Sequence, residues 1–197
     1  PTPDTLAYSD ATLLQGAIGA PFVLAGADPL VVSNALTLLA LPLSALAFFY
    51  FGWRLTHDAR AACLTGILGS IGPLRFEQYS HIEMQWLAFI PLAFIALLDT
   101  IAAPARRKGL LLGSLVSAQW LAGMYLGMML LAWAVPVGLV ALLAWARRPW
   151  RPLAEALAIA GLVIGVAFGA LARPYLRANA AHGEWETAVI DLYSAEP

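Results

Sequence analysis

One polar stretch interrupts an otherwise apolar sequence: Arg75-Phe76-Glu77-Gln78-Tyr79-Ser80-His81-Ile82-Glu83-Met84-Gln85-Trp86. It concentrates charged and amide side chains in a chain that is only 12% charged. Long apolar runs flank it on both sides. Ionisable groups placed between apolar segments are costly unless they face a cavity or one another, so this stretch supplies the first candidates for a functional site.

The composition around this stretch indicates the class of protein. The 197 residues are 61% hydrophobic, whereas soluble domains are about 45–50% apolar and about 25% charged. Several apolar runs approach the roughly 20 residues that cross a bilayer as a helix. We therefore expect an all-α protein, a polytopic helical membrane protein.

The apolar runs predict about six membrane-spanning helices. They cover residues 30–53, 61–74, 85–102, 109–122, 126–146 and 153–171. Asp28 and Pro29 predict the start of the first span, as its N-cap and first turn. The preceding run 11–27 is short and interrupted by Gly and Pro, so we expect an interfacial or re-entrant helix there. Whether this run crosses the membrane is left open.

Three parts of the chain follow from these runs. Residues 1–29 form a loop and interfacial helix, residues 30–173 a six-span domain, and residues 174–197 the start of a polar segment. Neither end has the look of a natural terminus, so we expect a fragment of a longer protein. Glycines recur at every third position of the second span, which predicts close helix packing: Gly66, Gly69 and Gly72.

The basic residues predict the orientation. Eight of the eleven Lys and Arg residues lie in the loops 54–60, 104–108 and 147–152. The positive-inside rule places these loops in the cytoplasm. The stretch 75–86, the turn 119–125 and the C-terminal segment then face outward. Four tryptophans near span ends are interpreted as interface anchors: Trp53, Trp86, Trp120 and Trp150.

The outward-facing polar residues have two interpretations. If the stretch 75–86 is helical, Glu77, His81 and Gln85 share one face and could bind a divalent metal or perform acid–base chemistry. Alternatively, this face simply meets water at a helix end. Arg75 could grip a phosphate through its guanidinium, or it could end a span by reaching toward water.

The motif Arg75-Phe76-x-Gln78-x-Ser80-His81-x-x-x-Gln85-Trp86 resembles a segment of bacterial multi-pass glycosyltransferases of the GT-C superfamily. The Asp28-Pro29 pair, the turn 119–125 and the tail 191–195 are also similar to those proteins. The resemblance implies sugar transfer from a polyprenyl-phosphate donor to a glycan or lipid acceptor. It implies a multi-pass protein of the bacterial inner membrane that acts at the outer face, with no nucleic-acid partner.

The resemblance also implies roles for the outward-facing residues. The catalytic candidates are His81, Glu77, Glu83 and Asp10. The substrate-binding candidates are Arg75, Gln78, Tyr79, Gln85, Tyr8, Gln119, Tyr125 and Arg173. In the superfamily an acidic residue near the first span acts as a base or metal ligand, and we expect that span upstream of this chain. No cofactor is firmly implied.

Two rival functions remain at this point. A transporter or lipid flippase would carry polar residues in the middle of its spans, whereas here the span interiors are nearly free of charge. A non-catalytic membrane subunit is the other alternative. It gains support if Glu77, His81 and Gln85 point separately into water.

Overall fold

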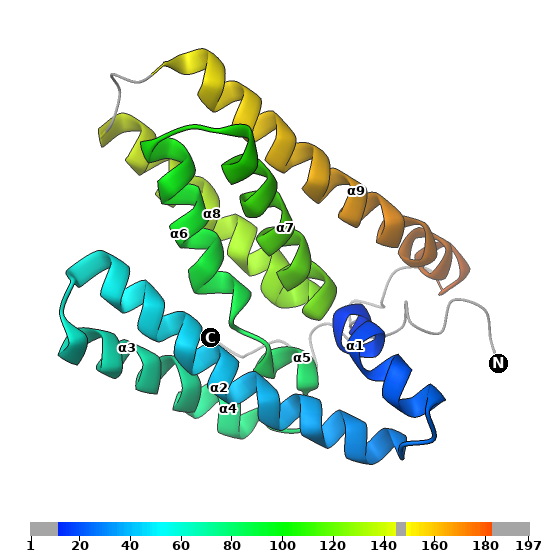
Figure 1. Cartoon of the computed structure of the whole chain (residues 1–197). Coiled ribbons are helices and arrows are strands. Elements are labelled where there is room, and N and C mark those ends of the chain that lie inside the picture. Colours follow the sequence, from blue (N-terminus) through cyan, green and yellow to red (C-terminus); the bar gives the residue numbers. More distant parts are fainter. Residues whose placement is uncertain (1–11, 145–148, 183–197) are drawn as a thin grey trace, which may run out of the picture.

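A computed structural model describes residues 12–144 and 149–182, and this part of the chain consists of helices joined by short connections (Figure 1). The helices are α1 (Leu13–Leu24), α2 (Pro29–Thr56), α3 (Ala59–Ile71), α4 (Pro73–Glu77), α5 (Ile82–Gln85), α6 (Phe89–Ala102), α7 (Arg106–Ala122), α8 (Met124–Ala144) and α9 (Trp150–His182). The all-α prediction is confirmed for the described residues, in which no strand occurs.

Three of these helices are long and apolar enough to cross a membrane: α2, α8 and the part of α9 from Trp150 to Arg177. Each of the other predicted spans also contains a helix, but a shorter one. The 14 residues of α6 extend about 21 Å, against about 30 Å for the hydrocarbon core of a bilayer. Helix length in the described part therefore establishes three candidate spans, and the predicted six remain a prediction.

The outer surface of the long helices is apolar, as expected for contact with lipid. Leu38 of α2, Val140 of α8 and Leu162 of α9 are among many large apolar side chains that are about two-thirds exposed. Soluble monomers rarely expose contiguous apolar surfaces of this extent. The exposure fits a membrane protein.

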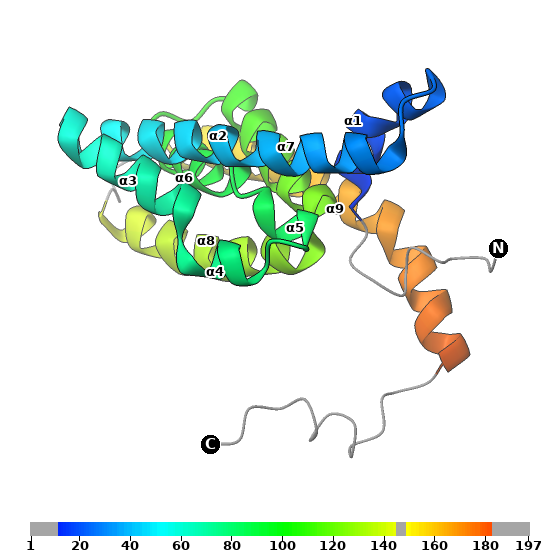
Figure 2. The same cartoon turned by 90° about the horizontal axis from the view of Figure 1, so that it is seen from below.

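The helices form two groups that meet at the centre of the molecule. α2 packs along α3, and α7 packs along α9 with α6 and α8 beside it (Figures 1 and 2). A core of Ala, Leu, Ile and Val side chains fills the space among α6, α7, α8 and α9. A smaller cluster joins the two groups and consists of Leu36, Ala40, Trp86 and Ala122. Beyond α7, the C-terminal end of α9 projects away from the other helices (Figure 2).

Two local predictions about α2 and its neighbours are confirmed. The Asp28 carboxylate accepts a hydrogen bond from the Leu30 backbone N–H at 2.7 Å, and Pro29 is the first residue of α2. The predicted close packing occurs at Gly66 and Gly69 but not at Gly72, which caps α3; a Cβ added to Gly66 would lie 2.9 Å from the Ala45 carbonyl oxygen of α2. Gly69 lies against the Phe48 ring in the same interface.

Polar contacts gather the basic loops at one end of the bundle (Figure 1). The Arg54 guanidinium pairs with Asp99 at 2.7 Å, and Lys108 donates to the Asp99 carbonyl at 2.9 Å. Arg106 pairs with Glu155 at 2.5 Å. The Arg54–Asp99 pair is partly exposed and adds at most about 1 kcal/mol, whereas the Arg106–Glu155 pair is open to solvent. These contacts join the ends of α2, α6, α7 and α9. The polar stretch 75–86 lies farther along the bundle, toward its other end (Figure 1).

Candidate functional site

The polar stretch does not form one helix, so the condition under which Glu77, His81 and Gln85 would share a helical face is not met. α4 ends at Glu77, a turn follows, and α5 begins at Ile82. The Gln85 side chain explains the break, because its Nε2 donates to the Gln78 carbonyl at 2.8 Å and more weakly to the Arg75 carbonyl at 3.4 Å. The Gln78 carbonyl also accepts from the His81 backbone N–H at 3.0 Å, so the turn and the Gln85 amide together satisfy the carbonyls at the end of α4.

The predicted span 85–102 also begins later than expected. The chain leaves the helical conformation after Gln85 and resumes it at Phe89. The Gln85 carbonyl keeps one local donor, the Leu87 backbone N–H at 3.1 Å, and both it and the Trp86 carbonyl also take a donor from a distant part of the chain. Arg75 donates to the first and Gln119 to the second, the latter at 3.0 Å.

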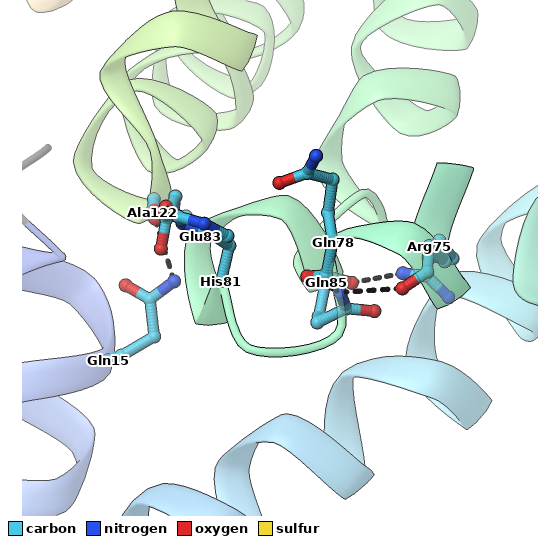
Figure 3. A network of polar contacts seen from close by, with 7 residues as sticks. All are labelled: Gln15, Arg75, Gln78, His81, Glu83, Gln85 and Ala122. Atoms are coloured by element: carbon cyan, nitrogen blue, oxygen red, sulfur yellow. Dashed lines mark hydrogen bonds and ion pairs between the residues drawn. The ribbon is translucent and has the colours of Figure 1, made fainter.

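Arg75 lies beside Gln85 in this region and is joined to it by hydrogen bonds (Figure 3). Its side chain is buried, with a residue exposure of 5%. Nη1 donates to the Ser70 carbonyl at 2.9 Å, and Nη2 donates to the Ser44 hydroxyl at 2.8 Å and to the Gln85 carbonyl. Ser44 is fully buried in α2, and its hydroxyl donates a hydrogen bond to the Ala40 carbonyl at 2.7 Å.

All acceptors around Arg75 are neutral. Within residues 12–144 and 149–182, no Asp or Glu forms an ion pair with its guanidinium. Burial lowers the pKa of Arg75 from its ordinary value, yet an arginine remains protonated at any physiological pH. The site therefore holds a buried positive charge whose hydrogen bonds are largely satisfied but whose charge is not balanced. Such a charge attracts an anion.

A largely apolar cavity of about 400 Å³ adjoins Arg75. Its lining consists of Phe48, Thr65, Leu68, Gly69, Gly72, Arg75, Met84, Leu87 and Leu126. Among the described residues of this lining, Arg75 is the only charged one. Its Nε is buried and has no hydrogen-bond partner in the described part of the chain. We call this space the Arg75 cavity; it combines apolar walls with one cationic donor.

The catalytic candidates do not gather around Arg75. His81 and Glu83 form a pair with 2.9 Å between Nδ1 and the carboxylate oxygen, and the His81 side chain is 55% exposed (Figure 3). Glu77 and Tyr79 are exposed. None of these four lines the Arg75 cavity. The arrangement offers an imidazole–carboxylate pair at the surface, separate from the buried cation.

The other predicted binding residues are scattered. Gln119 is fully buried in α7, Gln78 contributes its carbonyl to Gln85, and Tyr125 and Arg173 are exposed. Tyr8 and Asp10 lie outside the described residues. No group of three His, Cys, Asp or Glu that could hold a metal ion occurs among the described residues. A divalent metal is therefore not supported by this part of the chain.

Two tryptophans interpreted as interface anchors are buried instead. Trp86 is 4% exposed and Trp120 6% exposed. Trp86 packs with Leu36, Ala40 and Ala122, while Trp120 stacks on Phe168 with ring centroids 3.5 Å apart. Both side chains face the protein interior because the helix ends that carry them are covered by neighbouring helices.

Sequence reasoning missed Gln15, which belongs to the network of polar contacts drawn in Figure 3. We call this network, together with Gln119, the polar layer. Gln15, a residue of α1, is 3% exposed, and its Nε2 donates to the Ala122 carbonyl at the end of α7 at 2.7 Å. The available signal was an amide side chain within the apolar run 11–27. A polar group in such a run needs an internal partner.

Comparison of the chain with known protein families, with curated proteins and with solved structures finds no match. Its function must therefore be argued from the chemistry of the site, since a helical fold alone does not specify one.

Proposed function

We propose that this protein binds a lipid-linked phosphate at Arg75 as part of a GT-C-type glycosyltransferase of the bacterial inner membrane. The lipid would be a polyprenyl-phosphate sugar donor, and the sugar would pass to a glycan or lipid acceptor at the outer face. The observation that carries this proposal is the buried, uncompensated guanidinium of Arg75 beside an apolar cavity. An anionic head joined to an apolar chain complements both features.

The positive-inside rule supports the proposed orientation. The basic loops at 54–60 and 104–108 are joined by the Arg54–Asp99 and Lys108–Asp99 contacts at one end of the bundle. We propose that this end is cytoplasmic. Six crossings, with the shorter helices tilted or surrounded by protein, are part of the same proposal.

The exposed His81–Glu83 pair favours a second candidate function. Because this pair does not line the Arg75 cavity, the chain could bind the lipid phosphate while another part of the protein, or a partner, performs the transfer. In this candidate the described helices form a non-catalytic lipid-binding unit.

Binding and transfer measurements test the proposal and separate the two candidates. The protein in nanodiscs is titrated with a polyprenyl monophosphate, and binding is followed by native mass spectrometry. Arg75→Gln should weaken binding at least about tenfold, because a charge-assisted hydrogen bond contributes about 1.5–3 kcal/mol. Arg177→Gln is the matched control, since Arg177 is exposed on α9, and it should leave binding unchanged.

Unchanged binding in a folded Arg75→Gln variant would refute the site. Arg75→Lys keeps the charge without the guanidinium fork and should bind with intermediate affinity. Sugar transfer is then assayed in His81→Ala and Glu83→Gln variants of the full-length protein. Loss of transfer with intact binding supports catalysis by the surface pair, whereas unchanged transfer favours the non-catalytic unit.

A further inference from the structure

The polar layer lies level with the middle of α2 (Figure 1). α2 is long and apolar enough to cross a membrane, and Arg54 in its last turn belongs to the basic end of the bundle. Ser44, which accepts a hydrogen bond from Arg75, lies ten residues before Arg54 in this helix. Ten helical residues extend about 15 Å, half of the roughly 30 Å hydrocarbon core. The Arg75–Ser44 contact is therefore near the middle of the membrane when Arg54 lies at the membrane surface.

Two other helices reach the polar layer at the same depth. In α6, the first residue, Phe89, is ten residues before Asp99, the partner of Arg54. In α7, Gln119 is eleven residues after Lys108, which donates to the Asp99 carbonyl. Each interval corresponds to about 15–17 Å of helix. Both helices thus cover the distance from the basic end to mid-depth and no more.

Beyond the polar layer, fewer of the described helices continue. α2 extends for 15 residues from Ser44 to Pro29, or about 22 Å. α9 extends from Phe168, which stacks on Trp120, to His182, and its end projects away from the other helices (Figure 2). α3, α6 and α7 have at most 17 residues each, and α8 packs along α6 and α7. The described helices therefore fill the half of the membrane nearer the basic end more completely than the other half.

Polar groups are nevertheless exposed at this depth. Gln85 holds the non-helical turn 78–80 at the polar layer, because its amide donates to the Gln78 carbonyl at 2.8 Å. Ser80 is exposed, and the His81 side chain is 55% exposed. Within a membrane, non-helical backbone and ionisable side chains occur only where protein buries them or a water-filled space meets them. Because these groups are exposed, they require water.

We infer that water and small hydrophilic solutes reach the polar layer near the middle of the membrane, through the half of the protein opposite the basic loops. Such solutes would meet the His81–Glu83 pair inside the membrane. Binding sites of membrane transporters are formed in this way, by discontinuous helices that meet at mid-depth. The inference does not rest on lipid phosphate binding at Arg75. It places a hydrophilic ligand of this protein within the membrane instead of at its surface.

Spin labels on the full chain in nanodiscs test the depth of the polar layer. In a Cys63→Ala background, which removes the only cysteine, Leu46→Cys and Val166→Cys carry labels at positions that are each 66% exposed. Leu46 is two residues from Ser44, and Val166 is two residues from Phe168. Electron paramagnetic resonance measures collisions of each label with oxygen, which dissolves in lipid, and with a nickel chelate, which stays in water. Both labels should show the high oxygen and low nickel accessibility of the bilayer centre.

A label in the turn tests the access of water at this depth. Ser80→Cys carries it, and Ala103→Cys, exposed after α6, is the aqueous reference. The nickel accessibility of the Ser80→Cys label should match that of the reference and exceed that of the Leu46→Cys label several-fold. Tyr79→Cys, at a 74% exposed position of the same turn, provides the same readout if Ser80→Cys does not fold.

Two results would overturn the inference. Nickel accessibility of the Leu46→Cys or Val166→Cys label equal to that of the Ala103→Cys reference would place the polar layer at the membrane surface. A turn label that meets oxygen but not nickel would show that water does not reach the layer. Neither measurement involves a lipid phosphate, so this inference and the proposed binding at Arg75 can fail separately.

Discussion

The Arg75 side chain supports the backbone, and the anion binding that we propose for it draws on a different property of the same side chain. Its Nη atoms donate to the Ser70 carbonyl, the Ser44 hydroxyl and the Gln85 carbonyl, so they support the backbone where the helix is broken. The positive charge is not balanced by these neutral acceptors. A neutral donor could satisfy the same carbonyls, so the presence of a cation points to an anionic ligand.

At the residue scale, two buried glutamines should respond differently to replacement by leucine. Gln85→Leu removes the amide that donates to the Gln78 and Arg75 carbonyls, and it should lower the free energy of unfolding by about 1–3 kcal/mol. Gln119→Leu loses the bond to the Trp86 carbonyl but also removes an Oε1 that has no partner in the described part of the chain. Its cost should stay below about 1 kcal/mol.

Unfolding in detergent, followed by circular dichroism against denaturant, measures both variants. Equal destabilisation would contradict the assignment of the helix break to Gln85.

The pH dependence of lipid phosphate binding is also decided at the residue scale. Burial lowers the pKa of Arg75, which means that the folded state disfavours the charged form. The associated loss of stability is fully present below the lowered pKa and would be relieved only as pH rises through it. Because arginine stays protonated at ordinary pH, Arg75 contributes no pH dependence between about pH 5 and pH 9.

A lipid monophosphate, in contrast, gains its second charge near pH 6. Its affinity for the wild-type protein should therefore rise between about pH 5 and pH 7.5, and this rise should be absent in Arg75→Gln. A titration of binding at several pH values in nanodiscs measures this. A rise of the same size in both proteins would argue against contact between Arg75 and the phosphate.

At the scale of elements, the backbones of α7 and α9 approach each other closely. Gly109 of α7 lies directly against the Ala156 backbone of α9, and Gly113 lies against Ala160, where an added Cβ would be 2.9 Å from the carbonyl oxygen. Small residues let the two helix backbones approach, as is common in membrane proteins. This interface fixes α7, which carries Gln119 and Ala122 to the polar layer.

Gly109→Ala should therefore separate α7 from α9, because its Cβ would overlap the Ala156 carbonyl. We expect a loss of about 1–3 kcal/mol in unfolding free energy. Gly138→Ala on α8 is the matched control, since its Cβ would be 3.7 Å from Leu97, an ordinary contact. It should be neutral or slightly stabilising, by up to about 1 kcal/mol, because alanine favours the helix. Similar losses in both variants would contradict this account of the interface.

Sequence reasoning succeeded where the deciding contacts are local. The cap at Asp28 involves residues two and three positions away, and the glycine spacing of α3 follows from helix geometry. It failed where distant residues decide. Arg75 meets Ser44 across 31 positions and Gln119 meets Trp86 across 33, so neither the inward turn of Gln85 nor the burial of Trp86 could be read from periodicity. Arg75 stood out in the sequence because it opens a polar stretch between two apolar runs, a signal that does not depend on where its partners lie.

At the scale of the whole molecule, the two ends differ in charge. The described basic residues of the loops after α2 and α6 and at the start of α9 lie at one end, while Arg75 and the turn 78–80 lie toward the other. This asymmetry is the physical basis of the proposed orientation.

Cysteine labelling tests the orientation, starting from a Cys63→Ala background that removes the only cysteine. Ser80→Cys and Ala103→Cys place thiols at two exposed positions, in the turn after α4 and after α6. A membrane-impermeant maleimide added to intact bacteria should label Ser80→Cys at once and Ala103→Cys only after permeabilisation. The reverse pattern would invert the orientation and remove the outer-face site.

The broken backbone between α5 and α6 also has a consequence for biosynthesis. The Gln85 carbonyl finds its donors in Arg75, which is made before it, and in the Leu87 backbone N–H two residues later, but the Trp86 carbonyl depends on Gln119, which leaves the ribosome 33 residues later. Until α7 arrives, that carbonyl must stay hydrated. In the newly made chain, water therefore remains bonded to the Trp86 carbonyl, and the insertion of α7 replaces that water with the Gln119 amide.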